Sequence, residues 1–187
     1  MAYESLLGLR KDTRHKIFIS YYHKDDEYYR YQFEQSFGHL FISKSVQPGA
    51  INSDVSADYI KRLIQMGYIT DASVVVILVG PKTYCRKHVD WEIGSSIRHT
   101  EYNPRSGLLG IVLPTYPTFK ENTYNPHTIP PRLNDNIECK FAKIYAWNTN
   151  PLTIQDWIHE AFERRNIIPP DNSYPSFANN RAGDHWQ

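Results

Sequence analysis

The chain has 187 residues and a mass of 21.9 kDa, which suits one α/β domain with a single core. Its 21 basic and 20 acidic residues give a formal net charge of +1, so no long-range field favours nucleic acid or an anionic membrane as a partner. A hydrophobic share of 41%, with 9 glycines and 12 prolines, excludes collagen, low-complexity disorder and a membrane bundle.

The two cysteines, Cys85 and Cys139, have no zinc-type or redox-type spacing, so we expect neither a disulfide nor a metal site. The first residues lack the charged start and the small-residue cleavage site of a secretory signal. The longest apolar run, Val74 to Val79, is far too short to span a bilayer. These features favour a cytoplasmic protein with no membrane partner.

The first half of the chain reads as alternating strands and helices. Residues 15–21 are β-branched and aromatic and predict a strand that the polar residues 23–26 end. A helix over 27–37 follows, with aromatic rings at every fourth position packed against a sheet. A short strand is expected within 41–46.

A turn over 47–52 leads to a helix that Ser53 or Asp54 can cap and that runs to about Met66. Residues 70–80 contain the continuous apolar run Val74 to Val79, which is typical of a central parallel strand covered on both faces. A helix over 87–99 comes next.

The second half continues the alternation, beginning with a strand over 107–114. Residues 114–136 are rich in Pro and Asn and predict a long surface loop. A last strand is expected over 142–147, and a capping box at Thr153 to Asp156 opens a helix through Arg165.

We expect three regions, a lead-in over 1–14, one domain over 15–168, and a tail over 169–187 that is loop or disorder. Alternating β and α elements predict a doubly wound, mainly parallel sheet with helices on both faces. Ligands of such sheets bind beyond the carboxyl ends of the strands. Functional residues are therefore expected in four segments: Ser20–Asp26, Gln47–Asp54, Gly80–Glu92 and the loop after Leu113.

Common catalytic signatures are absent from the sequence, including GxGxxG, the Walker A loop, HExxH and GxSxG. The Gly80–Thr83 segment lacks the spaced glycines of a phosphate loop and reads as a turn. The eight histidines show no metal-ligand spacing, so no metal site is expected.

The expected helix over 87–99 holds the most informative carboxylate. Glu92 falls at the edge of the apolar stripe of this helix, half exposed, with His88 and Ser96 on either side. Asp90 lies about 200° around the helix from Glu92, so the two cannot form a catalytic pair. Periodicity leaves two interpretations open, a glutamate that solvates a helix flank and a single functional carboxylate.

Several segments together resemble one family. They are Phe18–Tyr21 followed by Asp25, Thr70–Gly80, Arg86–Ile93, Gly107–Pro114 and Ile144–Trp147. This ordered set resembles the bacterial TIR-like family, and most of all the TIR-like sensors of Thoeris antiphage defence, the ThsB type. The resemblance covers about residues 16–165 and implies the flavodoxin-like TIR fold, in agreement with the predicted elements.

The resemblance implies an activity, cleavage of the nicotinamide–ribose bond of NAD to make a cyclic or adduct signal derived from ADP-ribose. Glu92 occupies the position of the catalytic glutamate. NAD is then the substrate and no cofactor is required. The family further implies a phage-derived trigger, a separate effector protein that reads the signal, and self-association through TIR surfaces.

The resemblance also implies substrate-binding residues beside Glu92. One of these residues, Ser20, lies near the end of the first expected strand, and Tyr22 and His23 follow that strand. The Tyr22 ring can stack on a base, and His23 can contact a phosphate. Asp54 matches the pocket-covering loop and can bond a ribose hydroxyl, although it can equally cap a helix. His88 stands where many plant and animal TIR domains carry Trp.

Two other functions stay open at this point. A non-catalytic TIR interaction module would not turn over NAD, whereas a nucleoside deoxyribosyltransferase-like enzyme would share the fold and the single glutamate but act on free nucleosides.

Overall fold

The computed structural model of the chain describes residues 14–44, 67, 69–101 and 104–186. The expected turn over 47–52, the helix capped by Ser53 or Asp54, and nearly all of the lead-in lie outside these residues.

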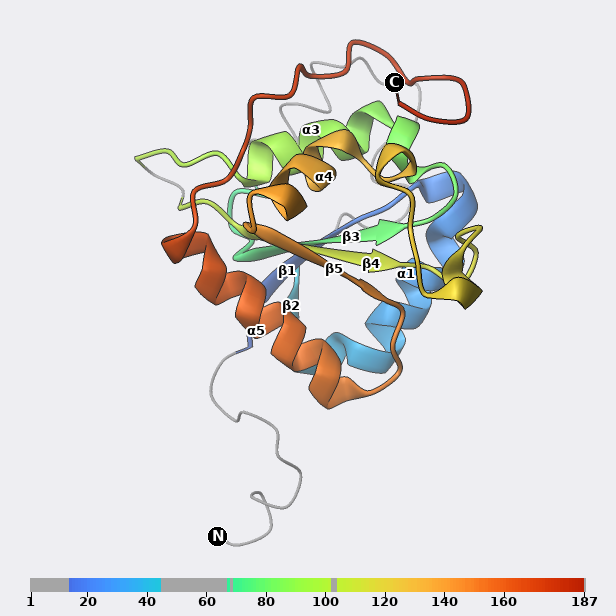
Figure 1. The fold of residues 1–187 in the computed structure, drawn as a ribbon. Helices are drawn as coiled ribbons and strands as arrows, with labels where there is room; N and C mark the ends of the chain where they lie inside the picture. The colour runs from blue at the N-terminus through green and yellow to red at the C-terminus, as the bar shows by residue number, and fades with distance from the viewer. Residues whose placement is uncertain (1–13, 45–66, 68, 102–103, 187) are drawn as a thin grey trace, which may run out of the picture.

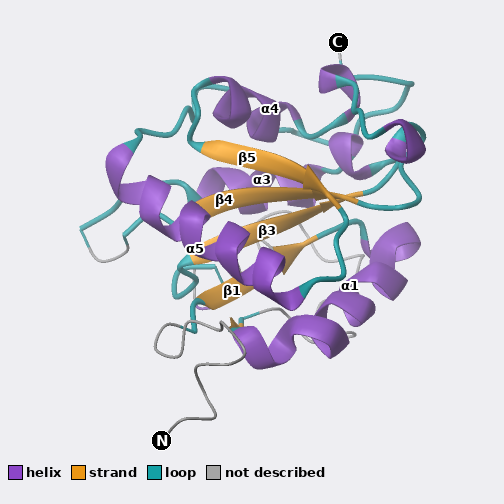
Figure 2. Ribbon diagram, turned by 60° about the horizontal axis from the view of Figure 1, so that its bottom comes forward, coloured by secondary structure: helices purple, strands orange, loops and turns teal. Residues whose placement is uncertain are grey.

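Within the described residues, five parallel strands form one sheet in the order β2-β1-β3-β4-β5 (Figures 1 and 2). The strands are β1 (Lys16–Ser20), β2 (Ile42–Ser43), β3 (Val74–Val79), β4 (Gly107–Val112) and β5 (Ala142–Ala146). This is the flavodoxin-like order, in which the direction of strand addition reverses between β1 and β3. The predicted doubly wound parallel sheet is confirmed.

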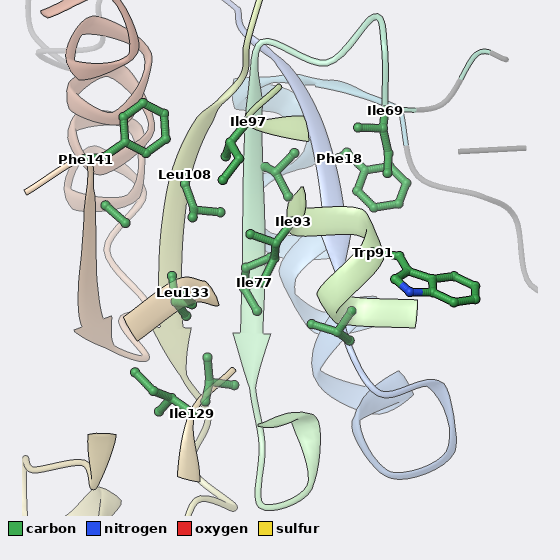
Figure 3. Close-up of a cluster of buried hydrophobic side chains, with 14 of the residues drawn as sticks. Phe18, Ile69, Ile77, Trp91, Ile93, Ile97, Leu108, Ile129, Leu133 and Phe141 are labelled. Atoms are coloured by element: carbon green, nitrogen blue, oxygen red, sulfur yellow. The ribbon is translucent and has the colours of Figure 1, made fainter. Parts of the chain in front are cut away.

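Helices cover both faces of this sheet (Figure 1). On one face, α3 (Lys87–Ser96) and α4 (Pro131–Glu138) pack on the cluster drawn in Figure 3, which includes Phe18 and Ile77. On the other face lie α1 (His23–Phe37) and α5 (Pro151–Ile167). The six residues of β3 are all fully buried, as the apolar run predicted.

Several predicted helix ends differ from the structure. Helix α1 begins at His23, four residues early, because Asp25 and Asp26 lie in its first turn, where the helix dipole favours negative charge. Helix α5 begins at Pro151 with Asn150 as its cap, so the capping box predicted at Thr153 is wrong. Helix α3 ends three residues early, at Ser96.

The segment over 114–136 is only in part the surface loop that its composition predicted: most of residues 115–128 are exposed or half-buried, and residues 129–134 are buried. It contains the short 3-10 helices η5 (Phe119–Glu121) and η6 (Pro126–Thr128) and the start of α4. Ile129 and Leu133 are fully buried. The pair of prolines at 130–131 reads as turn chemistry in the sequence, but Pro131 lies at the first helical position, where its missing N–H costs nothing.

Residues 169–186, named here the C-terminal strap, form an extended loop with no regular helix or strand in this described stretch. The strap runs over α3 and α4 (Figure 1). Phe177, in its middle, is buried. Of the two expectations for the tail, loop and disorder, the structure shows a loop that packs on the domain.

Candidate functional site

The carboxyl ends of β1 and β3 meet at the switch point of the sheet, which is where ligands bind in such folds. Ser20 is the last residue of β1, and it is followed by the start of α1. Gly80 follows β3 and leads through the 3-10 helix η4 (Thr83–Cys85) into α3. The fold therefore brings together two of the four segments predicted to be functional, Ser20–Asp26 and Gly80–Glu92.

Glu92 is buried, with 8% of its surface exposed, and the Ser20 hydroxyl donates a hydrogen bond of 2.5 Å to its Oε2 atom. Burial raises the pKa of Glu92 to about 8, although the Ser20 hydrogen bond acts in the opposite direction. The expected half-exposed position is therefore wrong, and so is the interpretation of Glu92 as a solvated helix flank. The fold therefore places the Glu92 carboxyl group out of solvent, beside the end of β1.

His88 lies one helical turn before Glu92, and its Nε2 atom is 3.0 Å from the Tyr21 carbonyl oxygen. Because that oxygen only accepts, Nε2 carries the hydrogen and donates it. Burial lowers the pKa of His88 to about 4, so the ring is neutral at pH 7. The His23 ring lies between Tyr21 and His88, with centroid distances of 4.3 and 5.3 Å.

Tyr22 is the N-cap residue of α1. The Arg86 guanidinium stacks on the Tyr22 ring, 3.9 Å from the ring centroid. One face of the ring is thus covered by a cation. Four of the five predicted substrate-binding residues, Ser20, Tyr22, His23 and His88, lie around the end of β1. The fifth, Asp54, lies outside the described residues.

The sequence analysis missed a buried carboxylate at the same place. Asp26 is 1% exposed, and it accepts a hydrogen bond of 3.3 Å from the Thr83 hydroxyl. Burial raises its pKa to about 6. A Cβ atom on Gly80 would clash with the Asp26 carboxylate, so any other residue at this position would displace that carboxylate. The glycine directly after the central strand was the available signal for such a close approach.

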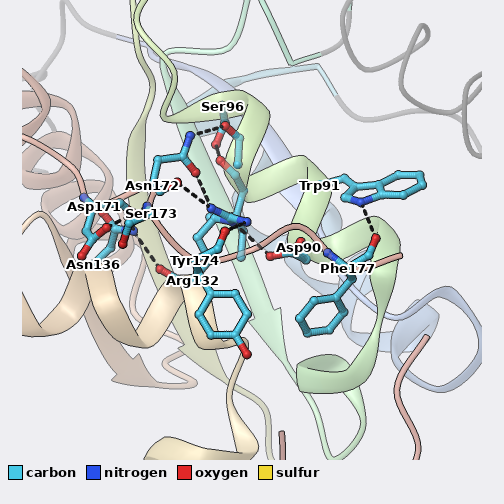
Figure 4. Close-up of polar contacts among 12 residues, drawn as sticks. Asp90, Trp91, Ser96, Arg132, Asn136, Asp171, Asn172, Ser173, Tyr174 and Phe177 are labelled. Carbon is cyan, nitrogen blue, oxygen red and sulfur yellow. Dashed lines mark hydrogen bonds and ion pairs between the residues drawn. The ribbon is translucent and has the colours of Figure 1, made fainter. Parts of the chain in front are cut away.

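The opposite flank of α3 is held by the C-terminal strap (Figure 4). Asp90 forms a fully buried ion pair with Arg132 of α4, at 3.0 Å between Oδ1 and Nε. The Arg132 guanidinium also donates to the Asn172 and Tyr174 carbonyl oxygens, and the Phe177 N–H donates to Asp90 Oδ2. Asp90 and Glu92 thus face different partners, as their angular separation predicted.

Trp91, next to Glu92, belongs to the strap side of α3. Its indole N–H donates to the Phe177 carbonyl oxygen at 2.9 Å, and the residue is 6% exposed. It therefore packs under the strap, away from the Ser20–Glu92 contact. Among the described residues, no cluster of metal-ligating side chains is found, and no helix is long and apolar enough to cross a membrane. Cys85 and Cys139 are both free thiols.

The sheet order and its switch point define a flavodoxin-like α/β domain. A sequence model of the family described as Thoeris protein ThsB, TIR-like domain, matches residues 18–118, which is more than half of the chain. The chain therefore belongs to the ThsB TIR-like family.

One solved structure similar to this chain is described as the activated Roq1 resistosome directly recognizing the pathogen effector XopQ (TIR domains). The identity is 10% and the TM-score 0.40, over 82% of this chain and 84% of that chain. The sequence matches no curated protein.

Proposed function

We propose that this TIR-like protein cleaves the nicotinamide–ribose bond of NAD, with Glu92 as its single catalytic carboxylate, and converts the ADP-ribose part into a signalling nucleotide in antiphage defence. The observation that carries the proposal is the buried Glu92, hydrogen-bonded to Ser20 at the switch point of the sheet. The family membership supports the same assignment.

The chemistry of NAD suits a site with one carboxylate. Nicotinamide leaves with the electrons of the glycosidic bond and becomes neutral, so no general acid has to protonate it. The ribose C1′ then carries positive charge until a hydroxyl or another nucleophile bonds to it and gives up a proton. A carboxylate in a water-poor site stabilises this charge strongly because little solvent screens the interaction.

The protonation state of Glu92 fits a cationic substrate. With a pKa of about 8, the empty site holds the neutral acid at pH 7. A nearby positive charge favours the ionised form, so the nicotinamide ring of NAD, which is cationic, lowers this pKa when it binds. Ser20 then holds the carboxylate by donating its hydroxyl hydrogen.

The neighbouring residues are assigned to binding. His23 and the exposed part of Tyr22 contact the nucleotide, and neutral His88 keeps the Tyr21 backbone next to the reacting ribose. Asp54 is assigned to a ribose hydroxyl on the basis of the family resemblance alone. The resemblance also suggests a cytoplasmic protein that is triggered by phage, self-associates, and makes a signal for a separate effector.

The direct test is nicotinamide release from NAD by the purified full chain. We expect release by the wild type and a loss of about 100-fold or more in Glu92→Gln, since loss of one electrostatic group in an active site typically costs this much. Glu121→Gln, a matched change at an exposed glutamate, should leave the rate unchanged. Equal rates in wild type and Glu92→Gln would contradict the role of Glu92, and turnover of free nucleosides instead of NAD would favour a deoxyribosyltransferase.

A further inference from the structure

A cavity of about 480 Å³ lies beside the proposed active site, between η4, the segment before α4, and the C-terminal strap. Glu92 and Ser20 do not line it. The strap supplies one wall, because the Arg181 N–H donates to the Cys85 carbonyl oxygen at 2.9 Å and the Tyr84 hydroxyl donates to the Gly183 carbonyl oxygen at 2.5 Å. Two segments about 100 residues apart in sequence are thereby joined into one preformed cavity.

The charge of the cavity wall is positive. Lys82, which pairs with Asp25 at 3.4 Å, Arg86 and Arg181 line it, and among the described residues Asp184 is the single acidic residue of its lining. Within the part of the chain that the structure describes, no carboxylate lies at ion-pair distance from either arginine. Both arginines are partly buried, and a partly buried cation without an anionic partner favours an anionic ligand.

The arginines are also fixed in place. Arg181 lies 4.1 Å from the centroid of the Phe177 ring and donates to the Trp186 carbonyl oxygen at 2.7 Å. Arg86 lies over Tyr22 and donates to the Lys82 carbonyl oxygen at 3.1 Å. Since these contacts use ring faces and carbonyl oxygens, they orient the cations without neutralising them. Preorganised cations of this kind lose little entropy when an anion binds.

The remaining wall is aromatic. The rings of Tyr84 and Tyr116 line the cavity, and the Tyr116 hydroxyl is held at 2.5 Å from Thr128 Oγ1. The volume is far larger than a free phosphate ion needs and falls in the range of about 300–1,000 Å³ that is usual for small-molecule sites. We propose that this cavity is a second ligand site, separate from the Ser20–Glu92 site, that binds a phosphorylated small molecule of the size of a nucleoside monophosphate.

The test is calorimetric titration of the full chain with three probes, AMP, adenosine and inorganic phosphate, in the absence of NAD. We expect saturable binding of AMP, no detectable binding of adenosine, and binding of phosphate that is weaker than that of AMP by about tenfold or more. No saturable binding of AMP, or phosphate binding as tight as that of AMP, would overturn the proposal. Because no turnover is measured, the result does not depend on the proposed NAD cleavage.

Variants locate the binding. Lys82→Glu reverses a charge on the cavity wall and should weaken AMP binding by about tenfold or more. Ala182→Trp fills the cavity from an exposed position of the strap and should abolish binding without removing a charge. Lys120→Glu makes the same charge change at an exposed lysine that does not line this cavity and should leave binding unchanged. Binding that survives both cavity variants would place AMP elsewhere and overturn the assignment.

Discussion

At the scale of single residues, the central feature is a carboxyl group that the fold removes from water. Glu92 loses hydration on burial and gains one hydrogen bond from Ser20. The lost hydration has the larger effect, and the pKa of Glu92 is therefore raised from an ordinary value of 4.5 to about 8. The sequence predicted that Glu92 lies at the edge of the apolar stripe of its helix. It could not predict the depth of burial, because that depth depends on the contact with Ser20 across 72 positions of the chain.

The raised pKa predicts how NAD cleavage depends on pH. The reaction requires ionised Glu92, and kcat/KM reports the ionisation of the free enzyme. We therefore expect kcat/KM to rise about tenfold per pH unit below pH 8 and to level off above it. Initial rates of nicotinamide release at subsaturating NAD between pH 6 and pH 9 measure this profile. A profile that is flat from pH 6 upward would show that Glu92 is ionised before substrate binds.

The same shift predicts a pH-dependent effect on stability. Below about pH 4.5 Glu92 is protonated in both the folded and the unfolded state. Between pH 4.5 and 8 Glu92 ionises in the unfolded chain, while the folded protein keeps the proton. The free energy of unfolding of the wild type therefore falls as pH rises through this range. Gln does not titrate, so Glu92→Gln should gain about 3–4 kcal/mol relative to wild type between pH 5 and pH 8. Urea denaturation at both pH values measures the difference. Other groups, such as Asp26, titrate in both proteins and cancel, so a pH-independent difference would contradict the raised pKa.

At the scale of elements, α3 is held from two sides. One side meets β1 through Ser20 and Glu92, and the other meets α4 and the C-terminal strap through the buried Asp90–Arg132 pair. The strap bonds mainly through backbone and amide groups, among them Asn172, whose side-chain amide donates to the Gly94 carbonyl oxygen. These contacts fix the position of the helix that carries Glu92.

Removing one partner of the buried pair should therefore be costly. Arg132→Met leaves Asp90 charged and almost without solvent, and we expect a loss of about 3–5 kcal/mol in the free energy of unfolding. Adding Asp90→Asn to that variant should recover part of the loss, because the unpaired charge is then gone. Chemical denaturation of the two single variants and the double variant measures the coupling. A loss in Arg132→Met below about 1 kcal/mol would contradict a pair that is tightly buried.

The sequence predicted elements well where they consist of apolar runs. The strands β3 and β4 and the helix carrying Glu92 follow from hydrophobic patterning. The strap and α4 escaped prediction for different reasons. The strap has no periodicity, since its order comes from hydrogen bonds to distant residues. Helix α4 begins with Pro131, a residue that signals a turn as readily as a helix start.

At the scale of the whole molecule, the sheet order determines where function can lie. Because strand addition reverses between β1 and β3, the chain segments that follow these strands diverge to opposite faces and leave the switch point accessible to a ligand. The same geometry brings the Ser20–Glu92 site and the strap-walled cavity close together, with Arg86 contacting Tyr22 on one side and lining the cavity on the other. The fold class and the region of the Ser20–Glu92 site could thus be predicted from the alternation of strands and helices. The strap-walled cavity could not be predicted, because one of its walls is the C-terminal strap, whose packing on the domain has no signal in the sequence.

The most direct measurement of the central claim is mass spectrometry of nucleotides from phage-infected cells that express either wild type or Glu92→Gln, with uninfected cells as reference. The account predicts nicotinamide release and a new ADP-ribose-derived species after infection in cells with the wild type only. Unchanged NAD and no new nucleotide in infected cells with the wild type would contradict the claim and favour a TIR module that acts by binding alone.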